Sequence, residues 1–168
     1  MPSCQKMLNN SMSFLSMHGH NISFQRPFCF RIIVMIKPRT YSVPQSLEDK
    51  INEVLENQFS ISLDDHKAIA ECIEALSEHY IRLPGTKTPW KEDWCQIAYL
   101  AYYLPLNEIR ARAVIEEGQK FHFFDHIDEV TDFGSGLGSS TFNLKFENQI
   151  HIEDSLIAQK LHQQLGGN

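Results

Sequence analysis

Three closely spaced glycines behind a short predicted strand constrain this chain more than any other feature of its sequence. Residues 129–132, extended by Phe133, are expected to form a strand, and the sequence GSGLG at residues 134–138 follows at once. The next residues, to about Asn148, are expected to be helical. Strand, glycine loop and helix in this order begin a nucleotide-binding βαβ unit. Glycines suit such a loop because they permit positive φ and let the backbone approach a ligand without an intervening Cβ.

An acidic residue follows the next predicted strand. Residues 149–152 are expected to form this strand, which leads into Glu153 and Asp154. Glu153 lies nineteen positions after Gly134, close to the interval of about 20 at which an acid receives ribose hydroxyls in dinucleotide-binding folds. The loop and the acid together favour a nucleoside site. The alternative is a surface glycine turn beside a solvated acidic pair.

The spacing of the glycines indicates which nucleoside is bound. A pyrophosphate-binding loop reads GxGxxG, whereas this loop reads GxGxG behind Asp132, a form that resembles motif I of class I methyltransferases, whose ligand is S-adenosylmethionine. The resemblance implies that the loop lies beside the methionine part of the cofactor, that the acid of the first strand orders the amino-acid end, and that the acid after the second strand binds the ribose. No catalytic residue follows from the motif. Carried over by position, the cofactor-binding residues are Asp132, Gly134, Ser135, Gly136, Gly138 and Glu153.

A narrower resemblance lies upstream of the loop. The segment AYLAYYLP at residues 98–105 is similar to one in the methyltransferase-like proteins associated with the mitochondrial small ribosomal subunit, a family with bacterial members. There an AYLAxRLP helix precedes an LDxGxGxG strand and loop. The similarity runs from about Tyr41 to Leu165, with departures at Tyr103, where the family usually has Arg, and at Thr131, where an aliphatic residue is expected. It implies the small ribosomal subunit or its RNA as partner, and a bacterial cytoplasm or a mitochondrial matrix as compartment.

Residues 46–120 are predicted to form a helical domain. Two segments carry apolar residues at helical spacing on one face, and the second is expected to begin at Ser62 as its N-cap. The apolar positions are Leu47, Ile51, Val54 and Leu55 in the first segment and Leu63, Ile69, Cys72, Ile73, Leu76 and Tyr80 in the second. A loop is expected over residues 82–90, because its prolines and glycine interrupt a helix.

A third helical segment, over residues 94–104, is apolar nearly all round and is expected to be buried. Pro105 disfavours helical geometry at the preceding residue and is expected to kink or break the helix there. The helix should resume at Asn107 and end with Gly118 as its C-cap. Its inward residues are predicted to be Ile109, Ala113 and Val114.

Residues 1–45 form a basic, acid-free segment, which is expected to be either disordered or transit-like. Up to Leu47 the chain has five Lys or Arg residues and no acid, which leaves 10 basic against 21 acidic residues, a net charge of −11, from Glu48 onward. An acidic body does not attract RNA through its overall field, so any RNA contact is expected at the amino-terminal arm or a local patch. Met35 offers an alternative start, which would make the preceding residues an over-extended reading frame.

No metal site is expected. The sequence lacks a CxxC pair, so zinc and iron–sulfur sites have no support, and reduced, buried thiols are the preferred interpretation of Cys4, Cys29, Cys72 and Cys95. A predicted loop gathers further potential ligands but gives them no fixed geometry; they are His122, Asp125, His126 and Asp128. The apolar run at residues 32–36 is too short to cross a bilayer, so no membrane is expected among the partners.

The expected fold class is α/β, with an amino-terminal helical region followed by a partial, Rossmann-like class I methyltransferase sheet in residues 121–168. Members of the resembled family continue through further strands, and many carry downstream cysteines for an iron–sulfur cluster. This chain instead closes at Asn168, after a helix predicted at residues 155–165. We therefore expect a truncated fold, no iron–sulfur cluster in this chain and weak or absent catalysis by the chain alone. Two paired strands also have exposed edges that favour self-association.

The sequence is compatible with three functions of different classes. The first is a methyltransferase-family protein of the small ribosomal subunit that binds S-adenosylmethionine, with catalysis dominated by positioning of the methyl donor. The alternative is a non-enzymatic relic or ribosome-assembly module, in which the helical residues 47–117 bind a partner and the cofactor has no affinity. A nicotinamide-nucleotide protein is a third reading, which the GxGxG spacing disfavours.

Overall fold

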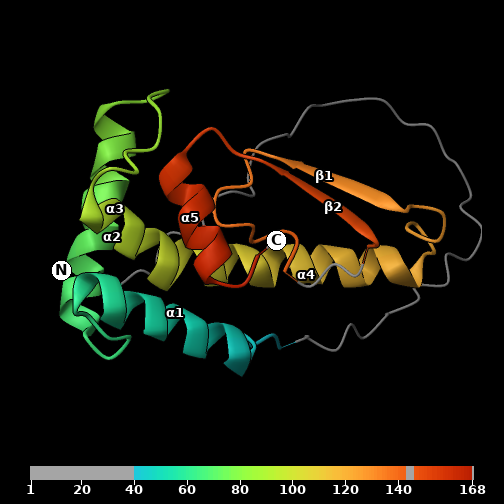
Figure 1. The fold of residues 1–168 in the computed structure, drawn as a ribbon, viewed down its shortest axis with the longest axis horizontal. Helices are drawn as coiled ribbons and strands as arrows, with labels where there is room; N and C mark the ends of the chain where they lie inside the picture. The colour runs from blue at the N-terminus through green and yellow to red at the C-terminus, as the bar shows by residue number, and fades with distance from the viewer. Residues whose placement is uncertain (1–39, 143–145, 168) are drawn as a thin grey trace, which may run out of the picture. The chain divides into compact units, whose positions relative to one another are not determined.

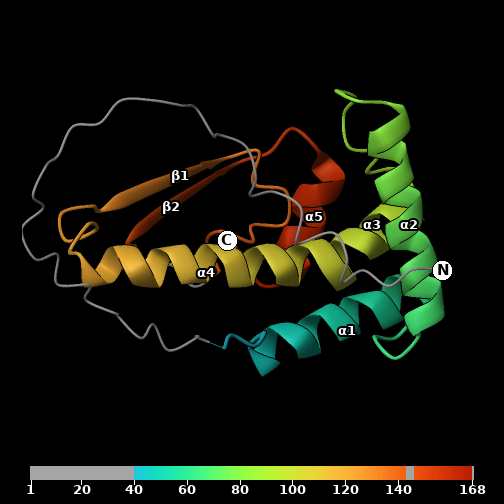
Figure 2. The same ribbon diagram turned by 180° about the vertical axis from the view of Figure 1, so that it is seen from behind.

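Helices and one small parallel sheet make up the described part of the chain, residues 40–142 and 146–167, in a computed structural model (Figures 1 and 2). All of these residues belong to one compact unit, residues 39–168, and most of the basic segment predicted at 1–45 lies outside the description. No helix within the described ranges is long and apolar enough to cross a membrane. The elements in chain order are α1 (Gln45–Phe59), α2 (His66–Arg82), α3 (Asp93–Ala98), the π-helical turn η2 (Tyr99–Tyr103), α4 (Leu104–Lys120), β1 (Glu129–Phe133), β2 (Asn148–Ile152) and α5 (Leu156–Gln164).

The core lies among the helices. The four apolar residues predicted on the inner face of α1 are all buried, and α2 contributes Ile69 and Leu76. Helix α2 packs along α3, while α1 contacts α3, η2 and α5. The predicted burial of the third helical segment is confirmed, because Cys95, Ile97 and Leu100 are all core residues. Burial raises the pKa of the Cys95 thiol to about 12.

Helix α2 begins three residues later than the sequence predicted. Ser62 is not its N-cap, since the helix starts at His66 and Asp65 occupies the capping position. Ser62 and Asp65 instead close a turn: the Ser62 amide donates to Asp65 Oδ2 at 2.7 Å, and the Asp64 amide donates to Ser62 Oγ at 3.2 Å. Short polar side chains often bond to nearby backbone in this way, so the same residues serve as well for a turn as for a cap.

Pro105 does not break the third helical segment. The backbone angles at Tyr99 and Tyr103 are right-handed helical, and α3, η2 and α4 follow one another without a gap. Proline has no N–H and its ring crowds the carbonyl four residues earlier. A wider π turn, with i→i+5 hydrogen bonds, directly before the proline accommodates both effects.

Helix α4 turns a different face inward from the one predicted. Val114 is 71% exposed, whereas Leu104 and Glu108 are buried. Arg112 pairs with Glu108 at 3.3 Å, and a buried charge needs such a partner. The spacing of apolar residues cannot predict that a helix face with charged residues is buried. Gly118 is not the C-cap, because the helix runs on to Lys120. Its lack of a side chain instead makes room for Phe124, whose Cε2 would lie 2.6 Å from an added Cβ.

The two strands are parallel neighbours, with Phe133 of β1 opposite Ile152 of β2. Exposed and half-buried residues alternate along both strands. The chain is thus α/β at the coarse level. The helix predicted after the glycine loop is not found over residues 139–142, which form turns, and residues 143–145 lie outside the description. Helix α5 is confirmed close to its predicted place, with the Ser155 hydroxyl accepting the Ala158 amide at 3.2 Å.

Candidate nucleoside site

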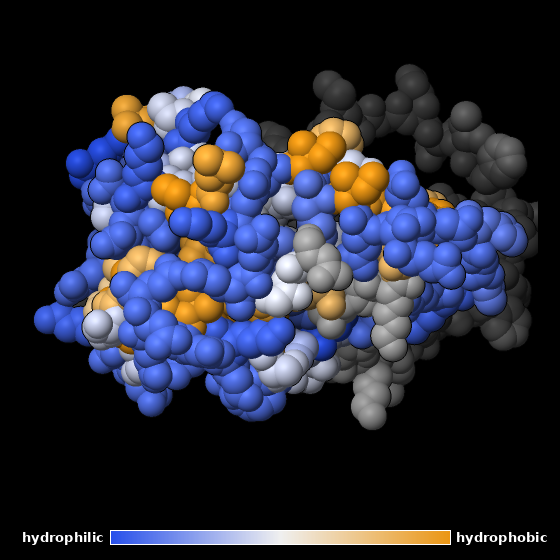
Figure 3. Space-filling view, viewed as in Figure 1, coloured by the Kyte–Doolittle hydropathy of each residue, from blue (hydrophilic) through white to orange (hydrophobic). Residues whose placement is uncertain are grey.

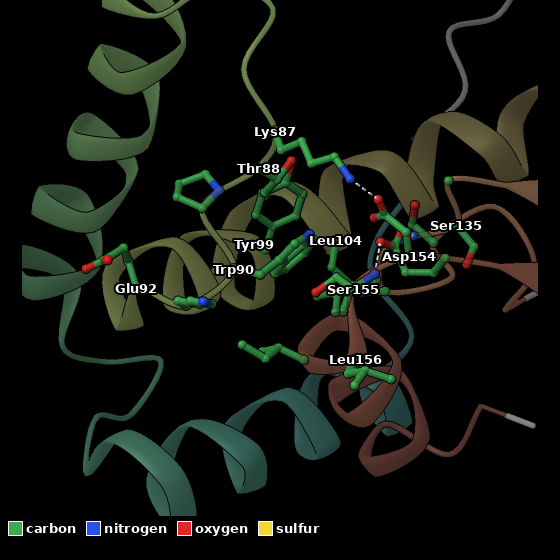
Figure 4. Close-up of a pocket in the computed structure, with 18 of the residues that line it drawn as sticks. Lys87, Thr88, Trp90, Glu92, Tyr99, Leu104, Ser135, Asp154, Ser155 and Leu156 are labelled. Carbon is green, nitrogen blue, oxygen red and sulfur yellow. Dashed lines mark hydrogen bonds and ion pairs between the residues drawn. The ribbon is translucent and has the colours of Figure 1, made fainter.

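A cavity lies between the loop after α2 and the carboxyl ends of the two strands (Figure 4). Its volume is about 1060 Å³, which is ample for a nucleoside-sized ligand. The glycine loop and the acids after β2 form one wall, and the loop that precedes α3 forms another. The lining residues are Thr86, Lys87, Thr88, Pro89, Trp90, Lys91, Glu92, Tyr99, Leu104, Asn107, Gly134, Ser135, Gly136, Leu137, Ser139, Glu153, Asp154, Ser155, Leu156 and Ile157.

Backbone hydrogen bonds tie the glycine loop to the end of β2. The amides of Gly134 and Ser135 donate to the Ile152 carbonyl at 2.7 and 3.3 Å, and the Gly138 amide donates to Ser135 at 2.7 Å. The three glycines have φ of +68°, +54° and +74°. L-residues with a Cβ rarely adopt this region, so the turn depends on glycine at these positions.

Glu153 points to the glycine loop. Its Oε2 accepts the Gly136 amide at 2.8 Å, and its Oε1 accepts the Ser155 amide at 2.9 Å. The carboxylate is half-buried and lines the cavity. Since a carboxylate offers about four acceptor positions, each oxygen can still accept a further hydrogen bond from a ligand hydroxyl.

Two of the predicted site residues lie outside the cavity lining. Asp132 accepts a hydrogen bond from the Ser140 hydroxyl on the far side of the loop. Gly138 lies against His162 of α5, whose ring an added Cβ would overlap, and His162 Nδ1 donates to the Leu137 carbonyl at 2.9 Å. These contacts hold the loop in place, while Gly134, Ser135, Gly136 and Glu153 face the cavity.

Trp90 is a cavity residue that the sequence did not single out. Its side chain packs on Tyr99 with ring centroids 4.4 Å apart and planes at 41°, and only 9% of the residue is exposed. The buried Gln96 amide donates to the Trp90 carbonyl at 2.9 Å. In the sequence, Trp90 stands out only as an aromatic residue in a proline-containing loop. Nothing in the neighbouring residues indicates that this loop lies beside the glycine loop.

Charged side chains at the cavity are more often acidic than basic. Glu92, Glu153 and Asp154 supply three carboxylates against the ammonium groups of Lys87 and Lys91. Lys87 forms an ion pair with Asp154, and this contact lowers the pKa of the Asp154 carboxyl. The local balance is unfavourable for a ligand that carries several phosphate charges.

A second group of titratable side chains lies under the glycine loop. The rings of His151 on β2 and His162 on α5 have centroids 4.6 Å apart. Burial, and then the neighbouring His162, lower the pKa of His151, while Asp132 acts in the opposite direction. His151 Nδ1 and His162 Nε2 are buried without a hydrogen-bond partner among the described residues. The lowered pKa of His151 favours its neutral form.

Two of the potential metal ligands in the loop after α4, His122 and Asp125, contact each other. His122 Nδ1 and Asp125 Oδ2 lie 2.8 Å apart, and both side chains are largely exposed. Within residues 40–142 and 146–167, no three His, Cys, Asp or Glu side chains converge on a point that could hold a metal.

Comparisons with protein-family models, with curated proteins and with solved structures found no match to this chain. Support for a function therefore comes from the motifs of the sequence and from the geometry of the cavity.

Proposed function

We propose that this chain binds S-adenosylmethionine in the cavity beside the glycine loop, as a methyltransferase-family protein with a partial Rossmann-like fold. The observation that carries the proposal is the contact between Glu153 and the Gly136 amide at 2.8 Å. It joins the acid after β2 to the centre of the glycine loop, at the shared carboxyl ends of two parallel strands. Open α/β sheets bind ligands at this edge.

The lining residues suit the adenosyl cofactor. Glu153 retains acceptor positions for ribose hydroxyls, and the loop glycines leave room for close approach by the ligand. An added Cβ on Gly134 would meet no atom within 4 Å, so the space above the loop is open on that side. Serine hydroxyls from Ser135 and Ser139 supply further polar groups.

A dinucleotide fits the same cavity less well. Pyrophosphate sites depend on free amides at the amino terminus of a helix, but residues 139–142 form turns. The amides of Gly134, Ser135, Gly136 and Gly138 are all engaged within the protein. Together with three carboxylates at the wall, this arrangement favours a ligand without phosphate.

The cofactor, when bound, supplies an activated methyl group, and the described residues of the chain would bind and orient it. Transfer from a sulfonium depends mainly on holding the methyl group in line with an acceptor. No described side chain is assigned as a catalytic base, so we propose weak or absent catalysis by the chain alone. The acceptor we propose is the small ribosomal subunit or its RNA, on the strength of the resemblance at residues 98–105 and 134–138.

Calorimetric titration with S-adenosylmethionine, S-adenosylhomocysteine and NAD tests the proposal. We expect binding of the two adenosyl amino acids and none of NAD. Glu153→Gln should weaken binding about tenfold or more, because a hydrogen bond to a charged group is worth about 1.5–3 kcal/mol. Glu71→Gln is the matched control, since Glu71 is exposed on α2, pairs with Lys67 and does not line the cavity. Absence of heat with either adenosyl ligand at protein concentrations near about 1 mM would overturn the proposal.

The uncovered face of the sheet favours a second candidate, a non-enzymatic binding module. Phe133 is 75% exposed, and Ile150 and Ile152 are 43% and 44% exposed on the neighbouring strand. Apolar surface gathers over the strands in Figure 3. Exposed apolar patches often mark interaction sites. Under this candidate, Gly136→Ala would change stability but leave partner binding intact.

A further inference from the structure

Trp90 occupies a fixed position beside the glycine loop. Gln96 holds its carbonyl at 2.9 Å and Tyr99 packs against one face of its ring. The loop that carries it is anchored next to the ring as well, because Tyr80 Oη bonds to Thr88 Oγ1 at 2.8 Å. A side chain with this many restraints is preorganised, so it costs little ordering entropy when a ligand binds.

Trp90 lines the cavity near the middle of the glycine loop, and 9% of the residue is exposed. Trp90 Cζ2 would lie 3.9 Å from a Cβ placed on Gly136, which is ordinary van der Waals contact. Figure 4 shows Trp90 beside Tyr99, in the cavity that Leu104 and Ser155 also line. A ligand that rests on the glycine loop at this point would therefore also touch the indole.

We propose that Trp90 is a specificity-determining residue that makes the site prefer the sulfonium of S-adenosylmethionine to the neutral thioether of S-adenosylhomocysteine. The inference rests on the proposed function. An indole is the aromatic side chain that attracts cations most strongly, and the two ligands differ at the sulfur by one positive charge and the methyl group. The resemblance to motif I implies that the methionine part lies beside the loop, which is the part of the site that Trp90 adjoins.

Other charged or aromatic groups at the wall are poorer candidates for this role. Lys87 and Lys91 would repel a sulfonium, and Lys87 is engaged with Asp154. Tyr99 has its hydroxyl bonded to Tyr80 at 3.1 Å and one side of its ring covered by Trp90. Glu153 accepts the Gly136 amide. In this position it would bind the ribose of both ligands equally and would not distinguish between them.

The test is the ratio of the two dissociation constants, measured by calorimetry on the full chain. Wild-type protein should bind S-adenosylmethionine more tightly than S-adenosylhomocysteine. Trp90→Leu should weaken S-adenosylmethionine about 2- to 30-fold and leave S-adenosylhomocysteine much less affected, given the strength of cation–π contacts. Trp90→Phe keeps a weaker ring and should give an intermediate ratio.

Trp94→Leu is the matched control, because Trp94 is half-buried, contacts His79 and does not line the cavity. It should leave the ratio unchanged. A Trp94→Phe protein has Trp90 as its sole tryptophan, and its fluorescence should change when S-adenosylmethionine is added.

Two failures are distinguishable. If the wild type binds neither ligand, the proposed function fails and the role of Trp90 with it. If both ligands bind but the wild type prefers neither or prefers the thioether, or if Trp90→Leu weakens both equally, only the inference about Trp90 is overturned. If Trp90→Leu does not fold, the ratio of Trp90→Phe decides: an intermediate ratio supports the inference, and a ratio equal to that of the wild type overturns it.

Discussion

The helical region and the strand region of this chain are built differently. In α1 to α4, large side chains such as Leu55, Leu76 and Leu100 are completely buried. In β1 and β2 every residue is exposed or half-buried. Protein stability scales with buried apolar surface, and two-stranded sheets are marginal by themselves. The helices therefore carry most of the stability, while the strands carry the loop and the acid of the candidate site.

Helix α5 connects the two regions. Its buried residues Ala158 and Leu161 belong to the core cluster that includes α1, and Lys50 of α1 donates to the Leu165 carbonyl at 3.0 Å. On its other side, His162 supports the glycine loop. The comparison predicts that changes in the helices lower global stability, whereas changes in the strand region mainly alter the site.

The largest expected effect is the loss of a core side chain. Leu100→Ala should lower the free energy of unfolding by about 2–5 kcal/mol, because it leaves a cavity among fully buried neighbours. Ile150→Ala, at a residue that is 43% exposed, should cost less than about 1 kcal/mol. Urea unfolding of the two variants measures both values. Equal losses would contradict the contrast between the regions.

The two loop glycines at the ends of the turn provide the next test. Both have positive φ, but only Gly138 lies against a neighbouring ring, that of His162. Gly134→Ala should cost about 1–2 kcal/mol through backbone strain. Gly138→Ala should cost about 1–3 kcal/mol more, because the added methyl displaces His162. Thermal unfolding of the two variants gives the difference, and a smaller loss for Gly138→Ala would show that α5 does not support the loop.

Acidification should destabilise the strand region through His151. Its pKa in the folded protein lies below its ordinary value of 6.5, so the unfolded chain takes up a proton first as the pH falls. Stability is therefore complete above about pH 6.5 and is lost as the pH drops from there to the folded pKa. Thermal melts across this range should show a flatter pH dependence for His151→Gln. The exposed His126 is the control, and equal flattening by His126→Gln would remove His151 as the cause.

The smallest expected effect is that of the ion pair across the mouth of the cavity. Lys87 and Asp154 are both largely exposed, and exposed pairs contribute little to stability. Lys87→Ala should leave the thermal midpoint unchanged within error. A clear decrease would mean that the loop before α3 depends on this contact rather than on Gln96 and Tyr99.

Local sequence patterns were sufficient for several elements of the fold. The face of α1, the strand before the glycines and the strand before Glu153 were all predicted close to their observed positions. Each depends on a short periodic pattern or on turn residues, which act within a few positions of the chain. The sequence also assigned the glycine loop and Glu153 to one site, because parallel neighbours bring their carboxyl ends together.

Features that depend on packing between distant segments were missed. An ion pair between the buried Glu108 and the half-buried Arg112 occupies the inner side of α4, and a π turn precedes Pro105. Trp90 reaches Gly136 although 46 positions separate the two residues in the chain. No local pattern encodes such a contact, and this is why half of the candidate site was not foreseen.

An NMR titration of ¹⁵N-labelled protein with S-adenosylmethionine tests the central claim most directly. If the ligand binds beside the glycine loop, the amide signals of Gly134, Gly136 and Ser155 and the indole signal of Trp90 should shift together with one dissociation constant. Signals of the exposed α2 residues Lys67 and Glu71 should stay in place. Unchanged spectra at saturating ligand, or shifts confined to residues away from the glycine loop, would contradict the claim.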